Sequence, residues 1–489
     1  MRPRRARPIL RNPIQAVPLS TDLCFRSAAD LARLIRERHA SVREVVTAHL
    51  ERIERINPTI NAIVTLVPER ALAAADTADA LLARGEPVGP LHGLPIAHKD
   101  LQETAGIRTT YGSPIYRNLV PAADSLLVER CRRAGAICVG KTNTPEFGAG
   151  SQTFNPVFGA TRNPYALDRT IGGSSGGAAA ALAARLLPIA DGSDMGGSLR
   201  NPASFGNVVG LRPSPGRVPS RGELGWFTLG VDGPMARSVE DLALFLSALA
   251  GPDDRSPIAL DDPGDAFRRP LGRSWEGVRI AWTGGCGLRY DAEVLAVVDR
   301  QRATFEALGA TVEDAAPDLS GLDEAFRILR AWYFEMALGA EYRRSPDQLK
   351  DTVRWNVEQG LRLTGPEVAR AEVLRTQAFH RVRRFFERFD FFVLPTVQVL
   401  PFDVTIPYPM EVGGQPSETY LDWMRSCYLI SAVGNPALSV PAGFSTEGLP
   451  VGLQIVGRHR DDWGVLQLGH AFEEATGFGR TAPPEPGGA

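Results

Sequence analysis

The sequence contains few cysteines, and none of them belongs to a paired motif. Five cysteines occur among 489 residues, an odd number without any C-x-x-C pair. Scattered cysteines are typical of a reducing compartment, and their spacing argues against a structural zinc site. We therefore expect a cytoplasmic protein without a structural metal.

The sequence also lacks an excess of either charge and any long apolar run. It has 54 lysines and arginines against 56 acidic residues, a net charge of −2, so no global positive field favours a nucleic-acid partner. No apolar segment reaches the length of a transmembrane helix. The basic start MRPRRARPILRNP is not followed by the apolar stretch of a signal peptide. We expect residues 1–22 to be a disordered basic arm, and neither nucleic acid nor a membrane to be a partner.

Histidines are scarce, with seven in the chain, and this weakens one motif. The run GGSSGG at 172–177 contains the G-x-S-x-G pattern of the α/β-hydrolase nucleophile elbow, which needs an apolar strand before the serine and a histidine base after it. Residues 168–171 predict a poor strand, and nothing marks His380, His459 or His470 as a base. The motif therefore does not favour an α/β-hydrolase.

A second motif also fails on physical grounds. Residues 135–142, GAICVGKT, match the phosphate-binding pattern G-x-x-x-x-G-K-[ST]. That loop lies between a strand and a helix and uses its middle residues for backbone contacts to phosphate. Here the middle, Ala-Ile-Cys-Val, predicts a strand that follows a helix, and residues 143–145 do not open another helix. A nucleotide triphosphatase is therefore disfavoured.

What is present is a chain of globular composition, 44% hydrophobic and 22% charged, long enough for a large core or two domains. Alternating helices and strands indicate α/β layers around one sheet. Helices are predicted over residues 27–37, 41–56 (ended by Asn57-Pro58), 69–84, 123–133, 239–249, 292–308 and most of 322–386. Strands are predicted over residues 136–139, 277–282, 391–394, 437–440 and 451–456.

The most informative stretch is residues 172–202, which holds the glycine–serine runs GGSSGG and GGS. A Gly-Gly-Ser turn can aim backbone N–H groups and a hydroxyl at one point, as an oxyanion hole beside a nucleophile requires. Residues 178–187 predict a helix of small residues and 188–191 a strand, so the two runs can approach each other. A flexible Gly/Ser linker is the alternative, but a linker has no reason to contain an apolar helix.

A serine without a histidine needs another base, and Lys99 is the candidate. Burial can lower the pKa of a lysine from about 10.4 towards 7 to 8, which leaves a neutral amine able to accept a proton. Pro95 and a short apolar run place Lys99 at the end of a strand. From these residues alone, a surface ion pair between Lys99 and a carboxylate is an equal alternative.

The run from 172 to 202 closely resembles the signature of the amidase signature family, GGSSGG followed by G-S-D-x-G-G-S-[ILV]-R-x-P. Further family-like landmarks are Gly93-Leu94-Pro95 with Lys99-Asp100, Lys141-Thr142-Asn143, Gly210-Leu211-Arg212-Pro213 and the run GLPVGLQ at 448–454. The resemblance extends from the first helices to beyond Gly457, with a divergent middle.

The resemblance implies a role for each matching residue. Ser198 corresponds to the nucleophile, Ser174 to a bridging serine preceded by a cis peptide, and Lys99 to the base. The backbone N–H groups of Met195, Gly196, Gly197 and Ser198 correspond to the oxyanion hole. Asp194 and Arg200 are expected to pair and hold that loop.

The family also implies the architecture, a central mixed β-sheet covered on both faces by α-helices. We expect a single amidase domain over residues 23–480, with an N-terminal helical pair at 23–66 packed outside. A divergent helical region at 320–388 is expected to line the substrate site. Residues 481–489 are expected to be a flexible tail.

The implied activity is hydrolysis of a small carboxylic amide through an acyl-enzyme, and no metal or cofactor is implied. Two alternatives stay open: an esterase or carbamate (urethane) hydrolase with the same residues, and a subunit of an amidotransferase. Asn201 replaces the glutamine usual in the tRNA-dependent amidotransferase subunit, which argues weakly against the latter. The oligomeric state, including a homodimer, is left open.

Substrate specificity is expected from the loop 146–154, the stretch 222–231 and the helices over 322–363. Aromatic residues in these segments suggest an apolar or aryl group on the substrate, and ordinary core packing is an equal alternative for each of them singly. They are Phe147, Phe154, Trp226, Phe227, Trp332 and Tyr333.

Overall fold

A computed structural model describes residues 23–222 and 224–485. The predicted arm at 1–22 and the last four residues of the predicted tail lie outside this part of the chain. The helices of more than one turn are α2 (Ala28–Arg36), α3 (Val42–Ile60), α4 (Pro68–Ala83), α5 (Leu126–Arg133), α6 (Gly176–Ala183), α7 (Arg200–Phe205), α8 (Val239–Leu249), α9 (Ala292–Asp299), α10 (Arg302–Ala307), α11 (Leu322–Arg344), α12 (Asp351–Leu361), α13 (Gly365–Phe385), α14 (Arg425–Val433) and α15 (Asp462–Thr476).

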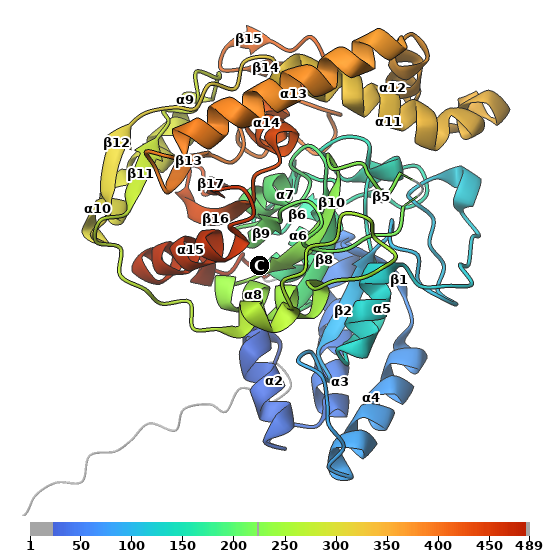
Figure 1. Cartoon of the computed structure of the whole chain (residues 1–489). Coiled ribbons are helices and arrows are strands. Elements are labelled where there is room, and N and C mark those ends of the chain that lie inside the picture. Colours follow the sequence, from blue (N-terminus) through green and yellow to red (C-terminus); the bar gives the residue numbers. More distant parts are fainter. Residues whose placement is uncertain (1–22, 223, 486–489) are drawn as a thin grey trace, which may run out of the picture.

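The predicted central mixed sheet is confirmed: it has eight strands in the order β12-β11-β13-β17-β16-β9-β10-β8 (Figure 1). Strand β11 runs parallel to both β12 and β13, and the remaining neighbours are antiparallel. The strands are β8 (Ile189–Asp194), β9 (Val209–Arg212), β10 (Val231–Ala236), β11 (Arg279–Trp282), β12 (Thr311–Asp314), β13 (Phe391–Pro395), β16 (Ala437–Phe444) and β17 (Pro450–Gly457).

Helices cover both faces of this sheet, and the side chains of β13 show why. Phe391 and Val393 point into one apolar cluster, which includes residues of α8, α9 and α15. Phe392 and Leu394 point into another, which includes residues of α11, α13 and α14. Because successive side chains of a strand alternate between faces, a continuous apolar run needs cover on both sides. The predicted layered α/β architecture is confirmed.

The strand that ends at Lys99 belongs to a separate sheet, which corrects the expectation of one sheet. Strands β1 (Ile63–Leu66), β3 (Ile137–Thr142) and β2 (Pro95–Lys99) form a three-stranded sheet in that order. It lies beside β8 and is joined to it where the Lys99 N–H donates to Asp191 Oδ1 at 2.9 Å. The side chain of Asp191 thus replaces the backbone ladder at this junction.

Two local predictions need correction. Helix α3 continues through Pro58 to Ile60, because the Asn57 side chain accepts from the N–H groups of Ala62 and Ile63 and completes the helix end there. A strand, β7 (Ala166–Thr170), forms where a poor one was expected. It pairs with β6 (Arg162–Asn163) in a small hairpin and bridges to Asp403 on its other side, so it lies outside the central sheet.

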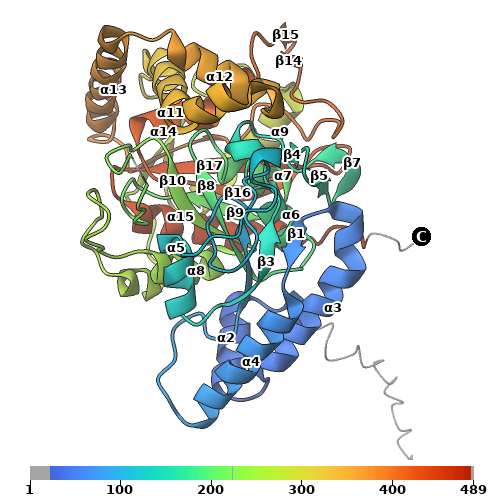
Figure 2. The ribbon, with the colours of Figure 1, turned by 90° about the vertical axis from the view of Figure 1, so that its right-hand side faces the viewer.

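Two groups of helices lie at opposite ends of the molecule. Helices α2, α3 and α4 form the lower part of the molecule in Figure 2, and α11 to α13 form the upper part. Residues 481–485, expected to be flexible, contact the domain: Thr481 O accepts from Tyr165 Oη at 2.6 Å, and Glu485 pairs with Arg52 at 2.8 Å. Within the described residues no helix is both long and apolar enough to cross a bilayer.

Candidate active site

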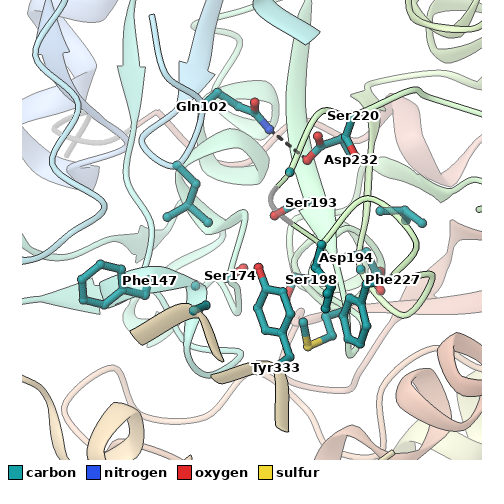
Figure 3. A pocket seen from close by; sticks show the side chains of 18 of the residues that line it. Gln102, Phe147, Ser174, Ser193, Asp194, Ser198, Ser220, Phe227, Asp232 and Tyr333 are labelled. Atoms are coloured by element: carbon teal, nitrogen blue, oxygen red, sulfur yellow. Dashed lines mark hydrogen bonds between the residues drawn. The ribbon is translucent and has the colours of Figure 1, made fainter. Parts of the chain in front are cut away.

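A cavity of about 550 Å³ opens where the two sheets meet the α11 region. Its wall includes Ser174, Ser193 and Ser198, with Asp232 and Gln102 at one side (Figure 3). Hydroxyl groups and apolar rings therefore share one concave surface, which is the usual composition of a small-molecule site.

The two glycine–serine runs are brought together by α6, a helix of small residues that are all buried. The Ser175 N–H donates to the backbone oxygen of Ser198 at 3.2 Å, which joins the first run to the second. The peptide bond between Gly173 and Ser174 is cis, as the resemblance implied. In Figure 3 the Ser174 and Ser198 side chains lie together at the cavity wall.

Lys99 lies fully buried behind these serines, with 0% of its surface exposed. Its Nζ is 2.7 Å from Ser174 Oγ, 2.9 Å from Ser175 Oγ and 3.1 Å from Ser193 Oγ. An ammonium donates to all three hydroxyls, whereas a neutral amine donates to two and accepts from the third. The structure thus rejects a surface ion pair and places the lysine in contact with Ser174.

Burial lowers the pKa of Lys99 to about 7, against the opposing effect of the Asp232, Asp191 and Asp194 charges. A substantial fraction of Lys99 is therefore neutral near pH 7. Burial raises the pKa of Asp232 to about 6, so the two groups titrate within about one pH unit of each other. The site thus combines a buried, partly neutral lysine with a nearby carboxylate.

His98, which precedes Lys99 on β2, is held away from the serines. Its Nδ1 lies 2.5 Å from Asp191 Oδ2, and the ring is 2% exposed. Burial acts to lower its pKa, but the charges of Asp191 and Cys138 outweigh this and raise it to about 9. A cationic imidazole at neutral pH cannot accept a proton, so His98 is a poor alternative to Lys99.

Asp232 provides a test of this electrostatic arrangement. Its negative charge stabilises the Lys99 ammonium, so Asp232→Asn is expected to lower the Lys99 pKa further and move the acidic limb of the kcat/KM profile down by about 0.5 to 1 pH unit. Profiles of kcat/KM between pH 5 and 9 measure this. The exposed Asp168→Asn is the matched control and should not move the limb. An unchanged or upward-shifted limb for Asp232→Asn would contradict the assignment.

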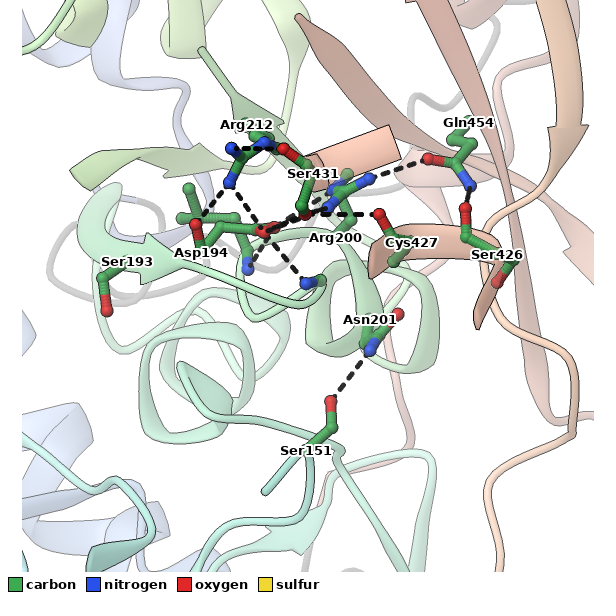
Figure 4. A network of polar contacts seen from close by, with 12 residues as sticks. Ser151, Ser193, Asp194, Arg200, Asn201, Arg212, Ser426, Cys427, Ser431 and Gln454 are labelled. Carbon is green, nitrogen blue, oxygen red and sulfur yellow. Dashed lines mark hydrogen bonds and ion pairs between the residues drawn. The ribbon is translucent and has the colours of Figure 1, made fainter. Parts of the chain in front are cut away.

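The loop that carries Ser198 is anchored by Asp194, as predicted (Figure 4). Arg200 donates from Nε to Asp194 Oδ2 and from Nη2 to Asp194 Oδ1, each at 3.0 Å, and Arg212 pairs with Oδ1 at 3.3 Å. Burial alone raises the pKa of Asp194, but the two guanidinium groups outweigh it and hold that pKa well below its ordinary range. Both partners of the expected Asp194–Arg200 pair are fully buried, so the loop has a fixed shape.

The backbone N–H groups of this loop differ in their partners. The Gly197 N–H donates to Asp194 Oδ1 at 2.9 Å, so it serves the loop and is not available to a substrate. Among the described residues, no acceptor is bonded to the N–H groups of Met195, Gly196 or Ser198. Gly197 has φ +111°, and a Cβ there would lie 2.6 Å from Cys427 Cβ, so only glycine fits the turn.

Asn201 is linked through Ser151 to the backbone just before Ser174. Its Nδ2 donates to Ser151 Oγ at 2.9 Å, and Ser151 in turn donates to the Gly173 carbonyl. Gly173 precedes Ser174, so Asn201 helps to fix the bridging position. Asn201, where the resemblance leads us to expect glutamine in the tRNA-dependent amidotransferase subunit, is buried beside the site and does not line the cavity.

The predicted aromatic lining is present in part. Phe147, Phe227 and Tyr333 line the cavity, and Phe227 stacks on Tyr333 with ring centroids 4.8 Å apart. Trp332 does not line it and packs edge-on against Phe227 at 6.0 Å. Phe154 and Trp226 are also absent from the wall.

Several polar neighbours of Lys99 were not predicted from the sequence. Ser193 and Ser175 were not assigned contacts with the lysine, nor were Asp191 and Asp232 recognised as its charged neighbours. Ser175 and Ser193 stand within the quoted motifs, so their side chains were visible candidates, whereas Asp232 has no sequence signal.

Among residues 23–222 and 224–485, no group of three or more histidine, cysteine or acidic side chains is arranged to hold a metal ion.

Comparison with known proteins identifies the class. The model of the family described as Amidase matches residues 44–466, most of the chain. The solved structure of a bacterial aryl acylamidase of the amidase signature family matches with a TM-score of 0.89 at 28% identity, covering 94% of this chain and 99% of that one. The chain belongs to the amidase signature family of amidohydrolases.

Two of the curated relatives carry different activities by name. An acylamidase of Rhodococcus erythropolis is 35% identical over 460 residues, covering 92% of this chain and 96% of the relative. A glutamyl-tRNA(Gln) amidotransferase subunit of Moorella thermoacetica is 37% identical over 506 residues, covering 94% and 99%. Both are similar over nearly their whole length, so overall similarity does not choose between them.

Proposed function

We propose that this chain is an amidase that hydrolyses a small carboxylic amide to an acid and an amine through an acyl-enzyme on Ser198. The observation that carries the proposal is the contact between the buried Lys99 and Ser174, at the wall shared with Ser198. This arrangement offers the three groups that a proton relay needs: a nucleophile, a bridging hydroxyl and a neutral base.

In the acylation step, Ser198 Oγ attacks the carbonyl carbon and its proton passes to Ser174, whose own proton passes to Lys99 Nζ. The oxygen of the tetrahedral intermediate accepts from the free N–H groups of Met195, Gly196 and Ser198, which are fixed before the reaction begins. Gly197 contributes by holding the turn through Asp194. The Lys99 ammonium then returns a proton through Ser174 to the leaving nitrogen, and the C–N bond breaks.

Deacylation repeats the same path with water. Water attacks the Ser198 ester, and its proton passes through Ser174 to Lys99. The intermediate collapses, and the proton returned through Ser174 restores the Ser198 hydroxyl as the acid leaves. Every proton is accounted for by groups of this chain.

The substrate class follows from the cavity wall and from the relatives. The rings of Phe147, Phe227 and Tyr333 line the cavity, which suits an aryl or other apolar group next to the amide. Relatives include an acylamidase and an aryl acylamidase by name. An anilide is therefore the first substrate to test.

Two alternatives use the same residues. An esterase or carbamate hydrolase is distinguished by comparing kcat/KM on an anilide, its matched phenyl ester and its matched phenyl carbamate. An amidotransferase component is distinguished by turnover of the purified chain alone. Inactivity alone with activity restored by partner subunits would favour the amidotransferase.

Tyr333 tests the assigned specificity wall. Tyr333→Ala removes the ring that stacks on Phe227, so it should change the ratio of kcat/KM between a bulky and a small anilide by about tenfold. Initial rates on the two substrates measure the ratio. Trp226→Ala is the control, because Trp226 is 77% exposed and lies off the wall. An equal loss on both substrates for Tyr333→Ala would count against the assignment.

A further inference from the structure

Arg330, on α11, is a buried cation in the wall of the same cavity. It is 5% exposed. Its Nε and Nη2 donate to Tyr420 Oη at 3.2 and 2.9 Å, and its Nη1 lies 3.2 Å from Met195 Sδ. Among the described residues, no carboxylate lies within 4.0 Å of this guanidinium. A buried charge normally has an ionic partner, because burial without one is costly.

The acidic groups of the wall are already engaged elsewhere. Asp194 is bound by Arg200, Asp232 accepts from Gln102 at 2.9 Å, and Glu103 accepts from Tyr111 at 2.8 Å. None of them neutralises Arg330.

A second cation, Lys350, lies next to the cavity wall, near Gly148 and Gly150. Lys350 Nζ donates to the backbone oxygen of Ala149 at 2.7 Å. Burial lowers the pKa of Lys350 to about 8, with Glu146 opposing this shift and the charge of Arg330 adding to it. The two cations are thus close enough to repel each other. An anion bound to Arg330 from the cavity would offset that repulsion.

The guanidinium is held ready for such an anion. Tyr420 Oη also accepts from Asn356 Nδ2 at 2.7 Å, and the Arg330 group lies 4.5 Å from the centroid of the Phe334 ring. The three bonds described use three of the five N–H groups of arginine, which leaves one on each terminal nitrogen. Two N–H groups on adjacent nitrogens match the two oxygens of a carboxylate.

We propose that Arg330 binds a carboxylate of the substrate, so that the preferred substrates are amides carrying a carboxylate some distance from the bond that is cleaved. This inference rests on the proposed amidase function. It refines the aryl or apolar substrate class, since the rings of Phe227 and Tyr333 hold the apolar part and Arg330 holds the charged end. The alternative is that the Arg330 guanidinium only packs in the wall and binds no ligand.

The test uses two matched pairs of anilides, one with the charge on the acyl side and one with it on the amine side. The first pair is the monoanilide of glutaric acid and 5-methylhexananilide, in which an isopropyl group replaces the carboxylate. The second pair is 4-acetamidobenzoate and 4-isopropylacetanilide. The ratio of kcat/KM, anionic to neutral, is measured for each pair.

The parent enzyme is expected to give a ratio above one in at least one pair, and Arg330→Gln to lower that ratio by about 10- to 100-fold. Arg330→Lys keeps the charge without the paired donors and should retain part of the preference. Arg343→Gln, on the exposed side of the same helix, is the control that should keep the parent ratio. Ratios that are the same in the parent enzyme and Arg330→Gln for both pairs would overturn the proposal.

A binding measurement separates this proposal from the catalytic one. In the Ser198→Ala background, calorimetry is expected to show the anionic anilide of the preferred pair binding at least tenfold more tightly than its neutral partner, and Arg330→Gln to remove the difference. If this preference appears while the parent enzyme cleaves no amide, the amidase function fails and the anion site stands. If amides are cleaved without any charge preference in binding or turnover, the anion site fails and the amidase stands.

Discussion

Replacing Ser198 with alanine is expected to lower kcat on an anilide by about 10⁴- to 10⁶-fold while the fold stays intact. The Ser198 side chain is partly exposed at the cavity wall, and the described residues give its hydroxyl no hydrogen-bond partner. Its removal therefore takes away the nucleophile without breaking a structural contact. Stopped assays of aniline release, together with circular dichroism and a thermal melt, measure both effects.

Ser174→Ala is the matched variant, because it removes a hydroxyl from the same wall. We expect a smaller loss than for Ser198→Ala, since a water molecule can replace a proton bridge but not a nucleophile. A Ser198→Ala enzyme that kept more than a tenth of the parent activity would rule out Ser198 as the nucleophile. A larger loss for Ser174→Ala than for Ser198→Ala would indicate that Ser174 is the nucleophile and Ser198 the proton bridge.

Lys99→Ala is expected to lower kcat/KM by at least about 10²- to 10⁴-fold, the usual contribution of a general base. In the parent enzyme the neutral amine is the active form, so kcat/KM should rise with pH through about 7, the pKa to which burial lowers Lys99. Lys99→Ala should lose the inflection near pH 7, and its residual rate, mainly from the attack of hydroxide, should rise steadily with pH. The pH profile of kcat/KM is the measurement.

Lys99→Arg separates the base from the positive charge. A guanidinium stays protonated at every pH in the assay, so this variant should be as inactive as Lys99→Ala although it retains a cation. Circular dichroism checks that each variant folds. Near-parent activity of Lys99→Ala with an unchanged pH profile would show that another group is the base, and the serine–serine–lysine mechanism would be wrong.

Much of the fold was predictable because its signals are local. The apolar run at 391–394 predicted the strand β13, and the helix predicted from residue 41 begins where Ser41 and Glu44 form a capping box. The end of α3 was not predictable in the same way. Asn57 organises that end by accepting hydrogen bonds from residues beyond Pro58, an effect that the Asn-Pro pair in the sequence does not reveal.

The candidate site was likewise predictable only where its signals are local. The glycine–serine runs and Lys99 were visible as motifs, and the structure brings them together. The separate sheet that carries Lys99 depends on strand pairing between distant segments, which composition does not encode. Asp232 and Arg330 were missed for a similar reason: in the sequence each is one charged residue among many, and only folding places each in the cavity.

The most direct test of the central claim is covalent labelling of the unmodified enzyme with a fluorophosphonate, followed by peptide mass mapping. The reagent bonds to an activated serine oxygen, so it reports the nucleophile without any assumption about the substrate. We predict a single adduct on Ser198, formed at a rate that rises with pH through about 7. An adduct on Ser174 or Ser175 in place of Ser198 would contradict the account.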